Sequence, residues 1–257
     1  MSKKNIWIFN QTAGKIDSGW GERHYCLSKY WVKNGFNVNI ISGSHNHLFT
    51  NQPKIDKKEW FTYEEVEKNI QFCWVNIPFY SGGLKKFYSN LIYTLKLFFL
   101  SIDKLGKPDV IIISSMPIFP IINGLFFKKI LKKTILIIEI RDLWPLTPMY
   151  LKGYSKNHPL IKILGWFEKI AYVKSDKIVS LLPNASKYIS EISKDKSKFH
   201  YIPNGIKESI VGKETLTEKI ISLIPKDKFI IGYTGSIGFA NAMEYFIEAS
   251  LAIKEEK

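Results

Sequence analysis

The chain has few of the residues and segments that mark secreted or membrane-spanning proteins. Of its 257 residues only two are cysteines, Cys26 and Cys73, and they are far apart in sequence. Two such cysteines neither form a disulfide scaffold nor have the spacing of a metal site, so the composition favours a reducing cytoplasm. The apolar run near the N-terminus, Ile6–Phe9, is too short for the core of a secretory signal, and we expect an intracellular protein.

An uninterrupted apolar segment is also missing. Residues 110–127 carry no charge over the length of a membrane-spanning helix, but two serines, two prolines and an Asn-Gly pair fall inside this stretch. We therefore predict a buried strand, a loop and a helix that begins near Phe119, and no membrane span.

Acidic residues are in the minority. The sequence has 37 Lys and Arg against 23 Asp and Glu, which gives a formal net charge of +14. The excess is concentrated in residues 68–138, and within them Lys85–Leu100 interleaves lysines with large apolar residues. This pattern fits either an interfacial helix that docks on an anionic membrane or a helix of the core. No nucleic-acid-binding module is recognisable, so we expect no nucleic-acid partner.

The sequence alternates short apolar runs with helical patterns. Strands are expected at 5–10, 36–42, 70–75, 110–114, 134–140, 177–181 and 199–202, and helices at 21–34, 85–105, 119–132, 159–174 and 184–193. This alternation predicts an α/β fold with a doubly wound parallel sheet covered on both faces. Ligands of such sheets bind at the carboxyl ends of the strands, so the loops after the strands are the candidate sites.

The loop after the first strand ends in two glycines, Gly19 and Gly21, just before a helix. Such glycines let a backbone approach a bound group closely, but no third glycine follows at the dinucleotide spacing, and no acidic residue ends the 36–42 strand. An NAD or FAD site is therefore disfavoured. The histidines of Ser44–His47 lack further ligands, so a polar loop is favoured over a metal site.

Charge appears abruptly after the apolar strand at 134–140. Arg141 and Asp142 follow Glu139-Ile140 at its carboxyl end. Charged groups there are costly to desolvate unless they are paired or used. Two interpretations stay open: Arg141 and Asp142 act in a site, or they pair with neighbours at the rim of the sheet.

The C-terminal segment has the pattern of a phosphate-binding unit. Lys228–Tyr233 has strand character, Gly235–Gly238 forms a glycine-rich turn, and residues 241–252 repeat apolar positions at helical spacing. A helix that starts after a glycine turn offers free N–H groups to an anion. The glycine-rich turn alone is weak evidence for a phosphate-binding site.

Six short motifs occur in the order found in family-4 glycosyltransferases, and the chain most resembles the bacterial branch that builds O-antigen, capsule or colanic-acid repeat units. They are Gly19/Gly21 with Arg23, Pro108–Ile111, Arg141-Asp142-Leu143-Trp144-Pro145, Ser175–Val179, Ile202-Pro203-Asn204-Gly205, and Ile231–Gly238. Together they span nearly the whole chain.

The resemblance implies a GT-B architecture, in which two Rossmann-like domains face each other. Residues 1–203 would be the acceptor-side N-terminal domain, and 204–257 the linker and the start of a donor-binding domain whose remainder is missing. The implied activity is sugar transfer with retention, from a nucleotide sugar such as a UDP-sugar to a lipid-linked saccharide in surface polysaccharide or lipopolysaccharide synthesis. The protein would be cytoplasmic and peripheral at the inner face of the cell membrane.

The resemblance also implies roles for single residues. Asp142 and Arg141 would belong to the catalytic region, and Gly19 and Gly21 would approach the donor diphosphate or the transferred sugar. Gly235, Ser236 and Gly238 would form the donor-phosphate loop. Neither a metal nor another cofactor is implied.

Two departures from the family pattern bear on activity. Ser236 and Asn241 stand where the family usually has basic residues, and the paired glutamates of its second domain have no counterpart before Lys257. We therefore expect no transfer by these 257 residues alone. The alternative is a non-catalytic module that binds an acceptor or a membrane.

Overall fold

The computed structural model describes residues 3–81, 83–205, 217–235, 237 and 241–255. The chain divides into two compact units. The first comprises residues 1–149 and 154–204, and the second comprises residues 150–153 and 205–257. The first unit holds the sheet and most of the helices.

One sheet of eight strands organises the first unit, in the order β3-β4-β2-β1-β5-β6-β7-β8. All neighbouring strands run parallel except the edge pair β3 and β4. The strands are β1 (Lys4–Phe9), β2 (Phe36–Gly43), β3 (Phe61–Glu67), β4 (Ile70–Val75), β5 (Val110–Ser114), β6 (Ile135–Ile140), β7 (Lys177–Ser180) and β8 (Phe199–Tyr201). The predicted α/β, Rossmann-like fold is confirmed.

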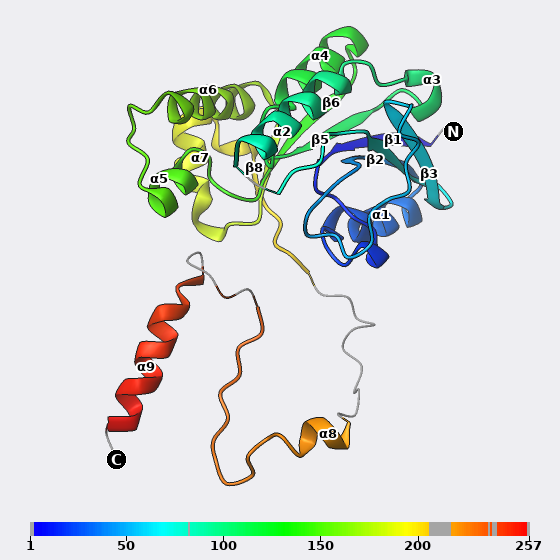
Figure 1. Ribbon diagram of the computed structural model, residues 1–257. Helices are drawn as coiled ribbons and strands as arrows, with labels where there is room; N and C mark the ends of the chain where they lie inside the picture. The colour runs from blue at the N-terminus through cyan, green and yellow to red at the C-terminus, as the bar shows by residue number, and fades with distance from the viewer. Residues whose placement is uncertain (1–2, 82, 206–216, 236, 238–240, 256–257) are drawn as a thin grey trace. The chain divides into compact units, whose positions relative to one another are not determined.

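Helices cover both faces of this sheet (Figure 1). They are α1 (Arg23–Lys33), α2 (Gly83–Leu97), α3 (Ile102–Leu105), α4 (Ile121–Leu131), α5 (Leu146–Lys152), α6 (Pro159–Lys174) and α7 (Ser186–Ser193). Alternate residues of β1 enter two different cores, because successive side chains of a strand point to opposite faces. Trp7 and Phe9 pack with residues of α2 and α4, whereas Ile6 and Ile8 pack on the side of α1.

The uncharged stretch of residues 110–127 forms strand β5 followed by helix α4, as predicted. The strand is buried at the centre of the sheet, which explains its continuous apolar character. None of the helices in the described ranges has both the length and the apolar character that crossing a bilayer requires.

The sequence did not predict the edge strand β3, and it wrongly predicted one continuous helix over 85–105. Strand β3 is rich in glutamate and largely half-buried, which is typical of an edge strand and gives no clear apolar alternation. The helix stops at Leu97, and a second one, α3, begins after Ser101, whose side chain accepts a hydrogen bond from Lys104 N. That serine is an N-cap, and it starts a new helix.

The expected strand at Lys228–Tyr233 is not formed. The described residues of the second unit contain helices α8 (Glu218–Ile221) and α9 (Met243–Glu255) but no strand with which this segment would pair. A strand needs a hydrogen-bonded neighbour, so apolar and β-branched residues alone do not produce one. The expected helix at 241–252 is present as α9.

A buried glutamate connects two helices of the first unit. Glu168 of α6 is 3% exposed, and Tyr188 of α7 donates a hydrogen bond of 2.9 Å to its carboxyl group. Burial raises the pKa of Glu168 to about 7, because the ionised form loses its hydration.

The raised pKa predicts a stability that falls as pH rises. The folded state binds the Glu168 proton more tightly than the unfolded chain, so the stabilisation is complete below the ordinary glutamate pKa and is lost as pH rises through about 7. Glu168→Gln should match the wild type at pH 5 and exceed its melting temperature at pH 8. The exposed Glu191→Gln on α7 serves as control, and equal pH profiles for all three proteins would refute the prediction.

Candidate functional site

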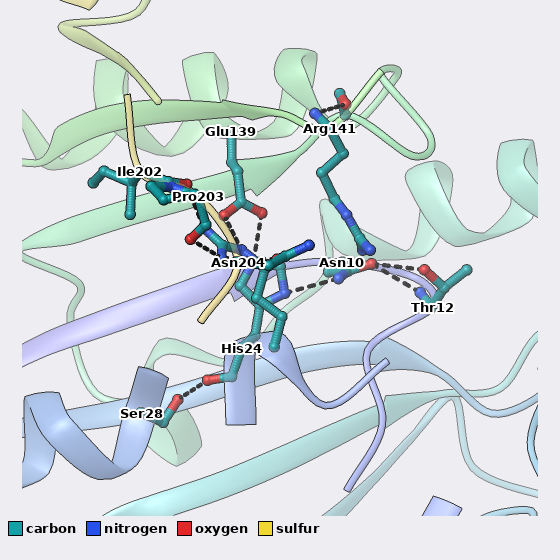
Figure 2. Close-up of polar contacts among 11 residues, drawn as sticks. Asn10, Thr12, His24, Ser28, Glu139, Arg141, Ile202, Pro203 and Asn204 are labelled. Carbon is teal, nitrogen blue, oxygen red and sulfur yellow. Dashed lines mark hydrogen bonds and ion pairs between the residues drawn. The ribbon is translucent and has the colours of Figure 1, made fainter. Parts of the chain in front are cut away.

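The strand order reverses at β1, which lies between β2 and β5. Such a switch point separates the loops that follow neighbouring strands and leaves a crevice at the carboxyl edge of the sheet. The residues after β1 and around the ends of β5 and β6 meet at this edge, together with the first turn of α1 (Figure 2).

A buried carboxylate forms the centre of this group. The side chain of Glu139, near the end of β6, is 4% exposed, and its Oε1 accepts a hydrogen bond of 2.9 Å from Nε of Arg23. Its Oε2 lies 2.8 Å from Nε2 of His24, although the two atoms are not aligned as a hydrogen bond. Burial raises the pKa of Glu139, but His24 and Arg23 outweigh burial and lower this pKa to about 2. Glu139 is therefore an anion at neutral pH.

Asn10 fixes the tautomer of His24. The backbone N–H and the hydroxyl of Thr12 both donate to Oδ1 of Asn10, each at 3.0 Å. The other end of the amide, Nδ2, therefore donates to Nδ1 of His24 at 2.8 Å. Nδ1 of His24 must accept this bond, which leaves the ring proton on Nε2, the nitrogen that faces Glu139.

Arg23 connects this centre to the segment that follows β8. Its NH1 group donates to the carbonyl of Pro203 at 2.9 Å and to Oδ1 of Asn204 at 3.0 Å, and its NH2 group donates to the carbonyl of Ile202 at 3.2 Å. The planar guanidinium suits such a fork of acceptors, and lysine does not. One side chain thus holds residues 202–204 against the carboxyl edge of the sheet.

Arg141 is the second arginine of the site, and it is uncommitted. Its backbone N–H donates to the hydroxyl of Ser115 at 3.1 Å, which fixes the start of the loop after β6. Figure 2 shows its side chain extending toward Asn10 and Thr12. Its guanidinium is half-buried and makes no hydrogen bond or ion pair with any residue that the structure describes. This cation is available to an anionic ligand.

Buried polar atoms without partners collect along the same edge. They include Oε1 of Gln11, which follows β1, Oγ of Ser114, which ends β5, and Nε1 of Trp144 in the loop after β6. Unsatisfied buried groups are few in native proteins and call for an explanation. Their position at the switch point marks this edge as the candidate site.

Gly19 and Gly21 allow the loop after β1 to pack tightly. Gly21 has a φ of +79°, and a Cβ there would lie 2.3 Å from the carbonyl oxygen of Thr12. Gly19 has a φ of +70°, and a Cβ there would lie 2.6 Å from Oγ1 of Thr50. Both positions therefore require glycine to pack the loop, whatever ligand it meets.

The structure brings some of the predicted site residues to one edge and leaves others apart. Arg141 and Asp142 follow β6, and Gly19 and Gly21 follow β1, so all four lie in loops at the carboxyl edge. The side chain of Asp142 is half-buried and, like that of Arg141, makes no hydrogen bond or ion pair with a described residue, so the alternative interpretation, pairing at the rim of the sheet, is not seen. Gly235 belongs to the second unit, whereas Ser236 and Gly238 lie outside the described residues.

The sequence reasoning missed Asn10, His24 and Glu139 as site residues. A signal was present for two of them, because Asn10 ends an apolar strand and Glu139 is the one charged residue within 135–140. For His24 no sequence signal showed whether its side chain faces the site or water. No group of three or more His, Cys, Asp or Glu side chains in the described ranges is placed to hold a metal ion.

Two solved structures align with this chain. A sucrose-phosphate synthase from Thermosynechococcus elongatus aligns with 13% identity and a TM-score of 0.49, over 80% of this chain and 93% of that chain. The catalytic domain of starch synthase IV from Arabidopsis thaliana, bound to ADP and acarbose, aligns with 13% identity and a TM-score of 0.51 over 80% of this chain. The similarity to the starch synthase establishes the fold.

This chain covers 52% of the starch synthase chain, so it spans about half of that catalytic domain. No protein-family model and no curated protein sequence matches the chain.

The Glu139 centre predicts a large and pH-dependent loss of stability on mutation. Glu139→Gln leaves Arg23, whose side chain is 10% exposed, without a counter-charge, which should lower the free energy of unfolding by about 3 kcal/mol at pH 7. Because the folded pKa of Glu139 is depressed to about 2, its stabilisation is present above the ordinary glutamate pKa and is lost as pH falls through about 2. Urea unfolding at pH 7 and pH 3 measures both effects.

The matched control is the exposed pair Lys29–Glu67, whose side chains are 38% and 41% exposed. Lys29→Gln should lower the free energy of unfolding by less than about 1 kcal/mol. Equal losses in the two variants would mean that the Glu139 pair is no stronger than a surface pair.

The glycine loop makes a second prediction, with a control inside the chain. Gly35 has a φ of +85° but nothing within 4 Å of the place of its Cβ. Gly35→Ala should therefore cost only the backbone strain of about 1–2 kcal/mol, and Gly21→Ala should cost clearly more, because its Cβ meets the Thr12 carbonyl. Urea unfolding compares the two, and similar losses would exclude a close-packing role for Gly21.

Proposed function

We propose that the chain is the acceptor-side part of a retaining GT-B glycosyltransferase. It serves a reaction that moves a sugar from a nucleotide-sugar donor, such as a UDP-sugar, to a lipid-linked saccharide in bacterial surface polysaccharide synthesis. The motif order and the Rossmann-like fold support this proposal, as does the fold similarity to a starch synthase that binds ADP and a saccharide.

The observation that carries the proposal is the uncommitted arginine at the carboxyl edge. A nucleoside diphosphate that leaves the sugar gains negative charge, and a preorganised cation in a half-buried site stabilises that charge. Arg141 offers such a cation next to the Glu139 centre, and its guanidinium suits a phosphate better than a lysine does.

The other residues receive roles that follow from their places. Asp142 orients the acceptor hydroxyl or meets the positive charge that develops on the sugar. Gly19 and Gly21 keep the loop after β1 thin enough for a substrate to approach. Gly235, Ser236 and Gly238 contribute to the donor-phosphate loop of the second domain.

The second unit fits the beginning of a donor-binding domain. Its apolar side chains are largely exposed: Phe229 is 91% exposed, Ile231 is 62% exposed and Leu223 is 76% exposed. Large apolar groups in this number need a covering surface. We infer that further protein, which completes the donor site, covers these exposed apolar side chains of the second unit.

Helix α2 supports the proposed membrane partner. Tyr93 and Leu97 of this helix are buried in the core, yet a stripe on the helix is exposed: Leu84, Tyr88, Leu91 and Leu95. A surface helix is normally polar on its outer side. An outward apolar stripe with nearby lysines fits a helix that lies on an anionic membrane, where a lipid-linked acceptor is presented.

A non-catalytic acceptor- or membrane-binding module is the second candidate. The exposed apolar stripe of α2 favours it, because membrane binding needs no donor site. The two functions differ in one observable, since only the glycosyltransferase uses Arg141 and Asp142 to transfer sugar.

A transfer assay tests the proposal in an enzyme whose donor domain is complete. With residues 1–257 continued by a full nucleotide-sugar-binding domain, Asp142→Asn and Arg141→Gln should each lower kcat by about 100-fold without unfolding the protein. Asp103→Asn, an exposed change on α3, is the control. Full activity of both variants would refute these roles, and no transfer by the completed enzyme would favour the non-catalytic module.

Liposome binding tests the membrane partner separately. Cosedimentation with anionic vesicles should occur at low salt and fall steeply as salt is added, because screening weakens attraction between lysines and lipids. Leu91→Glu should abolish vesicle binding, whereas the control Ile163→Glu, at an exposed position of α6, should not. Absent or salt-independent binding, or equal losses in the two variants, would contradict a docking role for α2.

A further inference from the structure

A row of polar side chains crosses one face of the sheet at the end opposite the candidate site. Asn5 of β1 pairs in register with Asn37 of β2, and Asn39 of β2 pairs with Gln71 of β4. Gln71 in turn pairs with Glu65 of the edge strand β3. The row therefore runs laterally over four adjacent strands near the amino ends of β1, β2 and β4.

All these residues lie on the face that is apolar elsewhere. Trp7, Ile41 and Cys73 belong to one buried core, and Asn5, Asn39 and Gln71 each precede one of them by two residues. Residues two apart on a strand share a face. On each of these strands the next residue on the core face, toward the amino end, therefore carries an amide instead of an apolar side chain. Polar side chains on a sheet face that a helix covers are costly without partners or a ligand.

The asparagines at the inner end of the row are fixed by hydrogen bonds. Asn39 donates to Oδ1 of Asn5 at 2.8 Å and to the carbonyl of Leu105 at 2.9 Å, and Asn5 donates to the same carbonyl at 2.7 Å. Gly106 packs directly on this pair, since a Cβ at Gly106 would lie 2.9 Å from Nδ2 of Asn5. The inner part of the row is therefore a rigid floor.

The outer part of the row has unused hydrogen-bonding capacity. The side chains of Asn37 and Gln71 are half-buried, and their amides make no hydrogen bond with any residue in the described ranges. Both amides line a cavity of about 490 Å³, in the size range of small-ligand sites. An amide offers a donor and an acceptor side by side, and a sugar hydroxyl is both as well.

The charge of the cavity is positive. Lys3, Lys104 and Lys107 line it against the single carboxylate of Glu65. Nζ of Lys104 lies 5.0 Å from the centre of the Tyr63 ring, a cation–π contact that restrains this lysine. Ammonium groups bind phosphate and carboxylate as point charges.

We propose that this cavity binds an anionic carbohydrate, that is, a sugar that carries a phosphate or a carboxylate group. The amides of Asn37 and Gln71 bind its hydroxyl groups, and the lysines bind its acid. The cavity lies at the amino ends of the strands, away from the carboxyl-edge site, so the inference does not depend on the proposed transferase activity.

Isothermal titration and NMR of the ¹⁵N-labelled chain test this site with four probes. Glucose 6-phosphate carries its negative charge on a phosphate and glucuronic acid on a carboxylate, so these two probes distinguish the two acidic groups. Glucose presents the sugar without the acid, and inorganic phosphate presents the acid without the sugar. At least one of the acidic sugars should bind more tightly than glucose and than phosphate, and it should shift the side-chain NH₂ signals of Asn37 and Gln71. Binding of none of the probes, or equal binding of glucose or of phosphate alone, would overturn the proposal.

Two variants with a matched control locate the binding. Lys104→Gln combined with Lys107→Gln should weaken binding of the acidic sugar by about tenfold or more, the effect of losing a charge-assisted hydrogen bond. Gln71→Met keeps the side-chain volume and should weaken binding without lowering the melting temperature. Lys129→Gln combined with Lys133→Gln removes two exposed lysines elsewhere and should leave binding unchanged. Equal losses in the two lysine variants, or full binding in both cavity variants, would refute the site.

Discussion

The buried carboxylate of Glu139 is the constraint on which the carboxyl edge depends. An ionised group with 4% exposure is tolerated only when it is compensated: Arg23 supplies the opposite charge, and the ring N–H of His24 lies 2.8 Å from the carboxylate. Since Arg23 also binds the carbonyls of Ile202 and Pro203, the pairing ties three distant parts of the chain together: strand β6, helix α1 and the exit from β8. A single ion pair therefore holds in place the loops that form the candidate site.

This arrangement separates structural groups from available ones. Asn10, His24 and Glu139 make their contacts with one another and with Arg23, whereas the guanidinium of Arg141 stays uncommitted among the described residues. A preorganised site needs both kinds of residue, because a cation can only be aimed at a ligand when its surroundings are fixed. The same division recurs at the opposite edge, where Asn5 and Asn39 form a fixed floor and the amides of Asn37 and Gln71 remain unused. We propose that the first site meets the charge of a leaving diphosphate and that the second binds an acidic sugar.

The sequence predicted the architecture well because apolar periodicity reports burial, and burial decides a parallel sheet. The prediction from sequence failed where the presence of a neighbouring strand, and not burial, decides whether a strand forms. Strand β3 is an edge strand whose glutamates give no apolar alternation, and Lys228–Tyr233 has strand composition but no partner strand among the described residues. In the site, glycines and charges after strands were visible as motifs, so Gly21 and Arg141 were predicted as site residues, and the structure places both in loops at the carboxyl edge. The network of His24 was not, because it joins residues that lie 14 and 115 positions apart in sequence, and only the fold shows that they meet.

Hydrogen exchange of the backbone amide of Ile202 tests most directly whether the guanidinium of Arg23, which is paired with Glu139, fixes the exit from β8. This amide donates to the carbonyl of Ser180, and its position depends on Arg23 through the carbonyl of the same residue. Arg23→Lys keeps a charge for Glu139 but loses the fork, so exchange at Ile202 should accelerate by roughly tenfold, the effect of about 1.4 kcal/mol, while exchange in β1 stays unchanged. An unchanged rate at Ile202, or an equal acceleration throughout β1, would contradict the account.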